Sequence, residues 1–319
     1  MDNSRIIKIK YQEIDINLYS EFLDNSDVVT PFHSVDWLKL IKDSRQDLEL
    51  SFLVVVENNT WLAVMPYFSR KYMPFTTISM PYGGYGGFIY NKFNFEKIKA
   101  IIKNNNYFIH QITCIHSFDD LYDDFLLNKK LNTWVVDCRC TFDELFSSFN
   151  TKTRNQVRKS FKSNIIYKLI ETKEELKECV KLYKNLVKKH NIQKPYSDKV
   201  FELLMRGSNE SIEFWIAKYE DEVIAYSVFL KSKKEVFYWL SAFNNDFSKA
   251  NPSLGILNKV FKTACEKKQI VNLGAVPLGN DGLKHFKQGV AGVKTEYKFY
   301  YNHYYSIANW LRSNVMGKR

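Results

Sequence analysis

The 319-residue chain is 45% hydrophobic and 16% aromatic, which is ample for two packed cores and excludes a chain disordered throughout. The net charge of +11 is concentrated in the second half, because residues 1–150 carry 15 − 19 = −4 and residues 151–319 carry 31 − 16 = +15. Apolar runs fall short of the roughly 20 residues that span a membrane, and residues 1–10 lack a signal-peptide core, so we expect a soluble cytoplasmic protein.

The positive second half would concentrate polyanions such as tRNA, coenzyme A, sugar nucleotides or anionic lipid headgroups, without choosing among them. A lysine-rich solvated surface explains the same charge equally well.

Cysteine and histidine spacing predicts no metal site. The five cysteines are an odd number without a repeating pattern, so we expect them to be structural and buried. Cys138-Arg139-Cys140 lacks the two-residue spacer of a zinc or redox pair, and the six histidines form no HExxH-type cluster.

In the first half, helices are predicted to alternate with a hydrophobic sheet. Asn58-Asn59 favours a tight hairpin turn, and Ser34 is placed to cap a helix. The predicted elements are strand 6–10, helix 34–42, strands 49–57 and 61–69, a glycine-rich connection over 73–90, helix 95–103, and strands near 108–115 and 134–138.

The second half predicts two leading helices, a strand meander and a βαβ finish. Thr141 with Glu144 resembles a capped helix start, and the domain boundary is expected near the break at Asn150-Thr151. The predicted elements are strand 165–170, helices 173–190 and 198–206, strands 213–218, 223–230 and 236–242, helix 252–267, strand 270–273, helix 280–288, strand 294–301 and an amphipathic segment over 304–315.

The turn before the helix at Pro252 is a candidate anion site. Proline fits the first helical turn, so the backbone amides of Ser253 to Gly255 would point into the turn and suit a phosphate or a tetrahedral oxyanion. Asn251 either caps this helix or binds an acyl carbonyl, and capping is favoured.

Three segments, TPFHSVDW (30–37), PYGGYGG (81–87) and RNQVRKS (154–160), together with the element order after Val236, resemble the Fem-type branch of the GNAT acyltransferases. That group includes peptidoglycan bridge-forming aminoacyl transferases and relatives in surface-polysaccharide loci. The resemblance implies an α/β fold of tandem GNAT-like domains, each a mixed central sheet flanked by helices. Residues 1–145 would form the acceptor side and residues 146–319 would carry the acyl-donor cleft.

The resemblance also implies roles for basic residues of the second half. Arg154, Arg158 and Lys159 share roughly one helical face and would hold substrate phosphates, the alternative being a solvated basic helix. Lys287, after Phe286, would stabilise the oxyanion or bind the donor, with Lys284 one turn away. The alternative for Lys287 is a surface lysine over a packed phenylalanine.

For two further groups of residues, a functional role and a purely structural role are both possible. Tyr238, in the strand that borders the donor cleft of GNAT folds, would protonate a leaving group, although core packing is the better expectation. The glycine-rich run over 82–87, with Tyr82 and Tyr85, is as well explained by a structural turn as by an acceptor-binding loop.

The expected function is transfer of an acyl or aminoacyl group to an amine of a cell-envelope or surface-polysaccharide precursor, an amine-bearing sugar or a peptidoglycan-type peptide. The segment ANPSLG (250–255) keeps one glycine of the usual pyrophosphate loop, so acyl-CoA and aminoacyl-tRNA both stay open as co-substrates. The alternative is a non-catalytic basic module that binds nucleic acid or an anionic membrane.

Overall fold

The chain forms two compact units, one of Met1–Leu131 with Glu296–Arg319 and one of Asn132–Thr295. The computed structural model describes residues 4–71, 73–105, 113–207, 211–277, 279–303 and 305–306. The amphipathic segment predicted over 304–315 lies outside these residues, apart from 305 and 306.

In the first unit, short helices alternate with strands of a mixed sheet. The elements are β1 (Arg5–Lys10), α1 (Ile16–Asp24), η1 (Pro31–His33), α2 (Val35–Ser44), β2 (Leu48–Glu57), β3 (Thr60–Arg70), β4 (Met73–Ile78), β5 (Ile89–Tyr90), η2 (Lys92–Asn94), α3 (Phe95–Asn104), β6 (Cys114–Ser117) and most of β13 (Val293–Tyr301).

The second unit is richer in helix. Its elements are the end of β7 (Leu127–Asp137), α5 (Phe142–Ser148), α6 (Thr151–Lys162), β8 (Ile165–Leu169), α7 (Lys173–His190), α8 (Asp198–Arg206), β9 (Ile212–Tyr219), β10 (Glu222–Lys231), β11 (Glu235–Phe243), η3 (Asn245–Ala250), α9 (Pro252–Glu266), β12 (Ile270–Asn272) and α10 (Asp281–Gly289).

Both units order their strands in the same way. In the first, β1 to β4 are successively antiparallel, β6 is parallel to β4, and β13 pairs antiparallel with β6. In the second, β8 to β11 are successively antiparallel, β12 is parallel to β11, and β7 pairs antiparallel with β12. The repeated order confirms the predicted α/β class with two tandem units.

The sixth strand of each unit comes from the other half of the sequence. Residues 135–137 of β7 pair with β12, and residues 298–301 of β13 pair with β6. The units therefore differ from the predicted division into 1–145 and 146–319: the second unit begins at Asn132, and the chain from Glu296 returns to the first. A linear pattern does not reveal such an exchange, because strand pairing is not local.

Local signals explain where several elements begin and end. Asn58 and Asn59 both adopt positive φ angles, of 49° and 63°, as a tight hairpin turn requires. Capping boxes formed by Thr141 with Glu144 and by Thr172 with Glu175 start α5 and α7. Helix α1, which the sequence analysis did not predict, is capped by the Asp15 carboxylate and buries Tyr19 alone.

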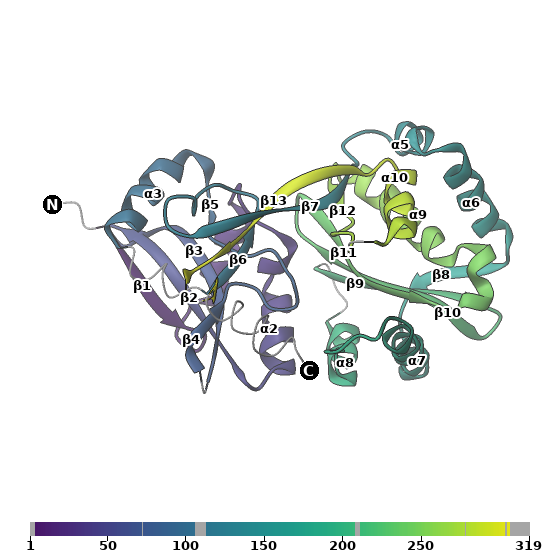
Figure 1. Cartoon of the computed structure of the whole chain (residues 1–319), viewed down its shortest axis with the longest axis horizontal. Helices are drawn as coiled ribbons and strands as arrows, with labels where there is room; N and C mark the ends of the chain where they lie inside the picture. The colour runs from purple at the N-terminus through teal and green to yellow at the C-terminus, as the bar shows by residue number, and fades with distance from the viewer. Residues whose placement is uncertain are drawn as a thin grey trace. The chain divides into compact units, whose positions relative to one another are not determined.

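The helices of the second unit cover both faces of its sheet. Helix α9 packs on β9 and β10 together with α5 and α6, while α7 and α8 lie on the opposite face (Figure 1). The core beneath α9 includes Leu257 and Phe261, both fully buried. Three of the five cysteines, Cys138, Cys179 and Cys265, are buried as predicted, whereas Cys114 and Cys140 are half-buried.

Candidate functional site

Two parallel strands of the second unit separate midway. β11 and β12 pair over three residues only, from Glu235 with Ile270 to Phe237 with Asn272. Beyond that point β11 continues beside β10, whereas the chain after β12 turns towards Trp134, which exchanges hydrogen bonds with Leu273 and Gly274. The two parallel strands thus stop pairing at the carboxyl end of β12, and α/β folds commonly bind ligands beyond the carboxyl ends of parallel strands.

A β-bulge lies in β11 at this separation. Val228 of β10 pairs with Leu240 and Phe229 pairs with Tyr238, so Trp239 is an extra residue in β11. Bulges redirect side chains and are frequent next to active sites.

Lys287 of α10 is buried beside the separation. Its side chain is 2% exposed, and Nζ donates hydrogen bonds to the carbonyl oxygens of Gly274 at 2.8 Å and Ala275 at 2.9 Å. A methyl group at Gly274 would lie 4.0 Å from both Lys287 Nζ and the Tyr238 carbonyl oxygen of β11, so both atoms are close to Gly274. Burial lowers the pKa of Lys287 to about 8.

A buried polar network fixes the strand end to which Lys287 is bonded. Asn272 Nδ2 donates to Glu235 Oε1 at 2.9 Å, while Asn272 Oδ1 accepts from Thr133 Oγ1 at 2.7 Å and from the Gly274 amide at 3.0 Å. Glu235 is 6% exposed, and burial raises its pKa to about 7, an effect that the Asn272 hydrogen bond opposes. This network could not be predicted from the sequence, since one Asn and one Glu in separate strands carry no local signal.

A pocket of about 640 Å³ opens at the start of α9. Residues of the first turns of α6 and α9 and one side of α10 line it, among them Lys152, Thr153, Pro252, Ser253, Gly282 and His285. The first turns of two helices therefore meet one cavity, where their dipoles favour an anion. Ser253 Oγ is buried and has no hydrogen-bond partner among the described residues.

The start of α9 differs in detail from the predicted anion turn. The amides of Leu254 and Gly255 donate to the Asn251 carbonyl at 3.1 and 3.2 Å, so both are already engaged. Gly255 is buried, and a methyl group there would lie 2.3 Å from the Tyr167 ring, which explains the glycine by packing. The amide of Ser253 has no acceptor within the described part of the chain.

The expected side-chain cap of α9 is corrected. Asn251 occupies the N-cap position with φ 54° and ψ 49°, and its side chain makes no capping hydrogen bond. Instead, Asn251 Nδ2 donates to the Lys249 carbonyl at 3.1 Å. A left-handed conformation, which Asn tolerates well, turns the chain into the helix.

The basic residues predicted on α6 do not line this pocket. The Arg154 guanidinium donates to the carbonyl oxygens of Ser147 and Phe149 and thereby ties α5 to α6. Arg158 is exposed over the Phe146 ring at 5.6 Å, and Lys159 is exposed. The pocket is lined instead by the neighbouring residues Lys152, Thr153 and Gln156.

The other predicted residues of the second unit fall in different surroundings. Tyr238 is half-buried, and its ring stacks on Phe229 with centroids 5.1 Å apart. Burial raises the pKa of Tyr238, which makes the phenol a weaker acid than free tyrosine. Lys284 is exposed on α10, one turn from the buried Lys287.

In the first unit, the segments 30–37 and 81–87 pack against each other. Thr30 Oγ1 donates to the Tyr85 carbonyl at 3.2 Å, and the rings of Phe32 and Tyr85 make an edge contact. Tyr85 is 3% exposed, and a methyl group at Gly84 would lie 2.6 Å from Phe32. Tyr82 has φ 61°, and its hydroxyl lies 3.1 Å from Ser44 Oγ.

The described residues contain no cluster of three or more His, Cys, Asp or Glu side chains arranged to hold a metal ion. Among the described helices, none is both long and apolar enough to cross a membrane.

Comparisons with known proteins agree on the fold. Residues 147–287 match the family described as acetyltransferase (GNAT) domain, whereas curated proteins gave no match. The structure of FemX has a TM-score of 0.72 and 13% identity, covering 96% of this chain and 99% of FemX. L-PGS from Bacillus licheniformis has a TM-score of 0.56 and 14% identity, covering 96% and 98%. A tandem GNAT protein from the clavulanic acid biosynthesis pathway has a TM-score of 0.50 and 8% identity, covering 93% and 98%.

Proposed function

We propose that this chain, whose residues 147–287 match a GNAT acetyltransferase domain and whose fold is similar to that of FemX and of a tandem GNAT protein, is an N-acyltransferase. The donor is an acyl-CoA or an aminoacyl-tRNA, and the acceptor is an amine of a cell-envelope or surface-polysaccharide precursor. The reaction takes place in the cytoplasm, where both donors are made.

The observation that carries the proposal is the separation of β11 and β12 with the buried Lys287 amine beside it. A thioester or ester carbonyl placed beside β11, beyond its pairing with β12, would lie near a fixed cation. The neutral acceptor amine attacks the carbonyl carbon and forms the C–N bond. The tetrahedral oxyanion then collapses, the C–S or C–O bond breaks, and the proton of the attacking amine passes to the departing sulfur or oxygen.

In this proposal Lys287 holds the chain at Gly274 and Ala275 in place and also stabilises the oxyanion. A protonated lysine has three N–H donors, of which two are used by Gly274 and Ala275, so one stays available for the oxyanion. A donor aimed at the developing charge in a water-poor site typically accelerates acyl transfer by a factor of about 10² to 10³. No covalent enzyme intermediate is required.

The pocket at the start of α9 is the proposed place for phosphates of the donor. The pocket has a volume of about 640 Å³. The first turns of α6 and α9 and the Lys152 ammonium supply positive potential, and Ser253 Oγ supplies a donor hydroxyl. CoA and a tRNA 3′ end both present phosphates, so this pocket alone does not choose between them.

Thermal unfolding with a panel of acyl-CoA thioesters and with charged tRNA tests the donor. A donor present at 100 times its dissociation constant stabilises the protein by about 2.7 kcal/mol. Stabilisation by one thioester would identify a CoA enzyme, and stabilisation by charged but not uncharged tRNA would identify an aminoacyl transferase. If neither class of donor stabilised the protein, the proposal would fail.

The non-catalytic basic module is not proposed. It depended on the positive charge of the second half, a property that a phosphate-bearing donor explains as well. Residues 147–287, which match the acetyltransferase domain, make up most of that half.

A further inference from the structure

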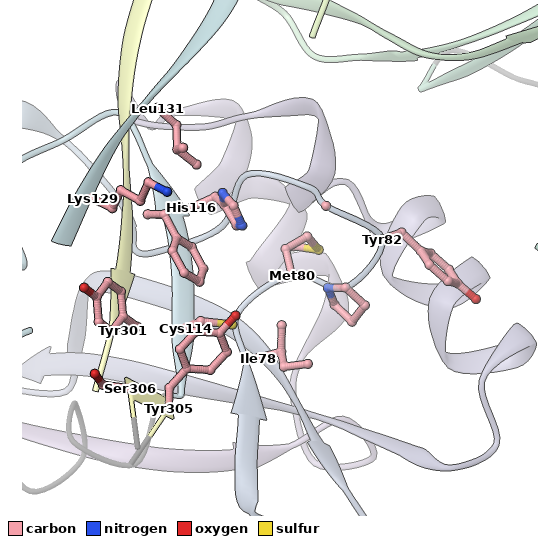
Figure 2. Close-up of a pocket in the computed structure, with 13 residues that line it drawn as sticks. Ile78, Met80, Tyr82, Cys114, His116, Lys129, Leu131, Tyr301, Tyr305 and Ser306 are labelled. Atoms are coloured by element: carbon pink, nitrogen blue, oxygen red, sulfur yellow. The ribbon is translucent and has the colours of Figure 1, made fainter. Parts of the chain in front are cut away.

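The first unit contains a pocket of about 670 Å³, which two residues of the predicted loop over 82–87, Tyr82 and Gly83, help to line. Its walls come from the end of β4 and the following loop, from β6, from the start of β7, and from the end of β13 with residues 305 and 306. Figure 2 shows Ile78 and Met80 on one side, Tyr301 and Tyr305 on the other, and His116 above them. The Tyr82 ring points away from the other labelled side chains, towards Ser44, to which its hydroxyl is hydrogen-bonded.

The pocket has almost no charge. Of its described lining residues only Lys129 is cationic, and that side chain is exposed. The remaining lining is mainly aliphatic and aromatic. A phosphate or carboxylate held here would lose water without gaining paired charges, so the pocket suits an uncharged group.

Aromatic rings build one wall. Phe299 stacks on Tyr301 with centroids 5.6 Å apart, and Tyr305 meets both rings at 5.5 and 5.8 Å. The His116 ring packs on Phe299 at 4.6 Å. These flat surfaces favour a ring stacked against or edge-on to them.

His116 is a polar side chain in this otherwise apolar wall. Its Nδ1 is buried and has no hydrogen-bond partner among the described residues. Burial lowers the pKa of His116 to about 4, so the imidazole is neutral near pH 7 and has both a donor and an acceptor nitrogen. Unsatisfied buried polar atoms are few in native proteins, and each requires an explanation.

The chain at the rim is conformationally unusual. Tyr82 and Gly83 have consecutive positive φ angles of 61° and 74°. A bulky residue in this region is a strained outlier, and such outliers cluster at ligand-binding sites.

We propose that this pocket binds the uncharged, ring-bearing part of the acceptor amine, and that His116 hydrogen-bonds a hydroxyl group on that ring. This proposal rests on the proposed acyl-transfer function, because only that function makes the bound amine the acceptor. The binding itself is measured without turnover.

Isothermal titration calorimetry with two probe amines tests this assignment. Tyramine and phenethylamine differ by one ring hydroxyl. We expect wild type to bind tyramine roughly 3- to 10-fold more tightly, which is the usual worth of one net hydrogen bond. His116→Phe keeps a ring of similar size, removes the unsatisfied nitrogen, and is expected to abolish the difference while leaving the melting temperature equal or higher.

Two further variants control the experiment. His190→Phe makes the same change at the exposed end of α7 and should preserve the preference for tyramine. Ile78→Trp narrows the pocket and should weaken both amines, with the melting temperature confirming that the variant is folded.

Several results would overturn the assignment. These are equal affinities of the two amines in wild type, no binding of either, or a preference that survives in His116→Phe. Binding with the expected pattern but without acyl transfer would uphold the pocket and contradict the proposed function. Acyl transfer at the same rate with and without the ring hydroxyl would uphold the proposed function and contradict the pocket assignment.

Discussion

At the scale of single residues, Lys287 departs most from what its sequence context predicts. A lysine in a basic helix is ordinarily solvated, yet this one is 2% exposed and bonded to two carbonyl oxygens. The sequence singled out the residue through a family resemblance, but its burial and its bonds to Gly274 and Ala275 depend on how α10 docks, which no local pattern encodes.

Replacing Lys287 with Met should destabilise the protein by about 1–3 kcal/mol, because two buried carbonyl groups lose their donor. Lys284→Met, on the exposed side of the same helix, should change the free energy of unfolding by less than about 0.5 kcal/mol. Urea unfolding of both variants measures the difference. Equal effects would show that Lys287 does not hold the strand end.

The pH dependence of the same variant has a defined sign. Lys287 has a folded pKa of about 8 against 10.5 for free lysine, so between these values the unfolded chain binds more protons. The free energy of unfolding of wild type relative to Lys287→Met should therefore rise from about pH 8 to about pH 10.5. A flat or falling difference over this range would contradict the buried position.

Glu235 titrates in the opposite sense. Burial raises its folded pKa from 4.5 to about 7, so the folded chain binds more protons and stability falls as the pH rises through this interval. Glu235→Gln keeps an acceptor for Asn272 and should stabilise the protein at pH 8 by up to about 3 kcal/mol, with little effect below pH 4.5. Thermal unfolding at both pH values tests this prediction, with the exposed Glu202→Gln as control. Equal effects of Glu235→Gln at the two pH values would contradict it.

At the scale of helices and strands, periodicity and capping residues were sufficient for most of the fold. The predicted helices over 173–190 and 198–206 coincide with α7 and α8, because caps and apolar spacing act within one element. Pro252 likewise marks the first residue of α9. Gly255 was predicted to bind a ligand. The sequence pattern could not reveal that the Tyr167 ring packs against this glycine and leaves no room for a side chain.

A methyl group at Gly255 should therefore be costly. Gly255→Ala would bring Cβ to 2.3 Å from the Tyr167 ring and should destabilise the protein by about 1–3 kcal/mol. Adding Tyr167→Leu should recover part of this loss. Gly282→Ala in α10 meets nothing closer than 3.9 Å and should be neutral or stabilising by up to about 1 kcal/mol. Chemical denaturation of wild type and these three variants compares them, and a harmless Gly255→Ala would reject the packing explanation.

At the scale of the whole molecule, two units with one strand order exchange their sixth strands. The repeated outline was visible in the sequence, whereas the exchange was not. Thr133 of β7 lies before the predicted boundary, yet it donates to the buried Asn272 of the second unit.

Fragments of the chain should report this exchange. Residues 146–319 lack β7, so β12 loses its partner strand and Asn272 loses Thr133. We expect this fragment to be insoluble or without a cooperative unfolding transition, while residues 132–295 unfold cooperatively. Circular dichroism with urea compares the two, and a stable 146–319 fragment would show that β7 is dispensable.

The measurement that tests the central claim most directly is mass spectrometry of amide products. Purified protein is incubated with an acyl-CoA or charged tRNA and a primary amine, alongside Lys287→Met and Lys284→Met. The account predicts a new amide with wild type and Lys284→Met, and at least about tenfold less with folded Lys287→Met. No amide from wild type with either donor, or equal product from all three proteins, would contradict it.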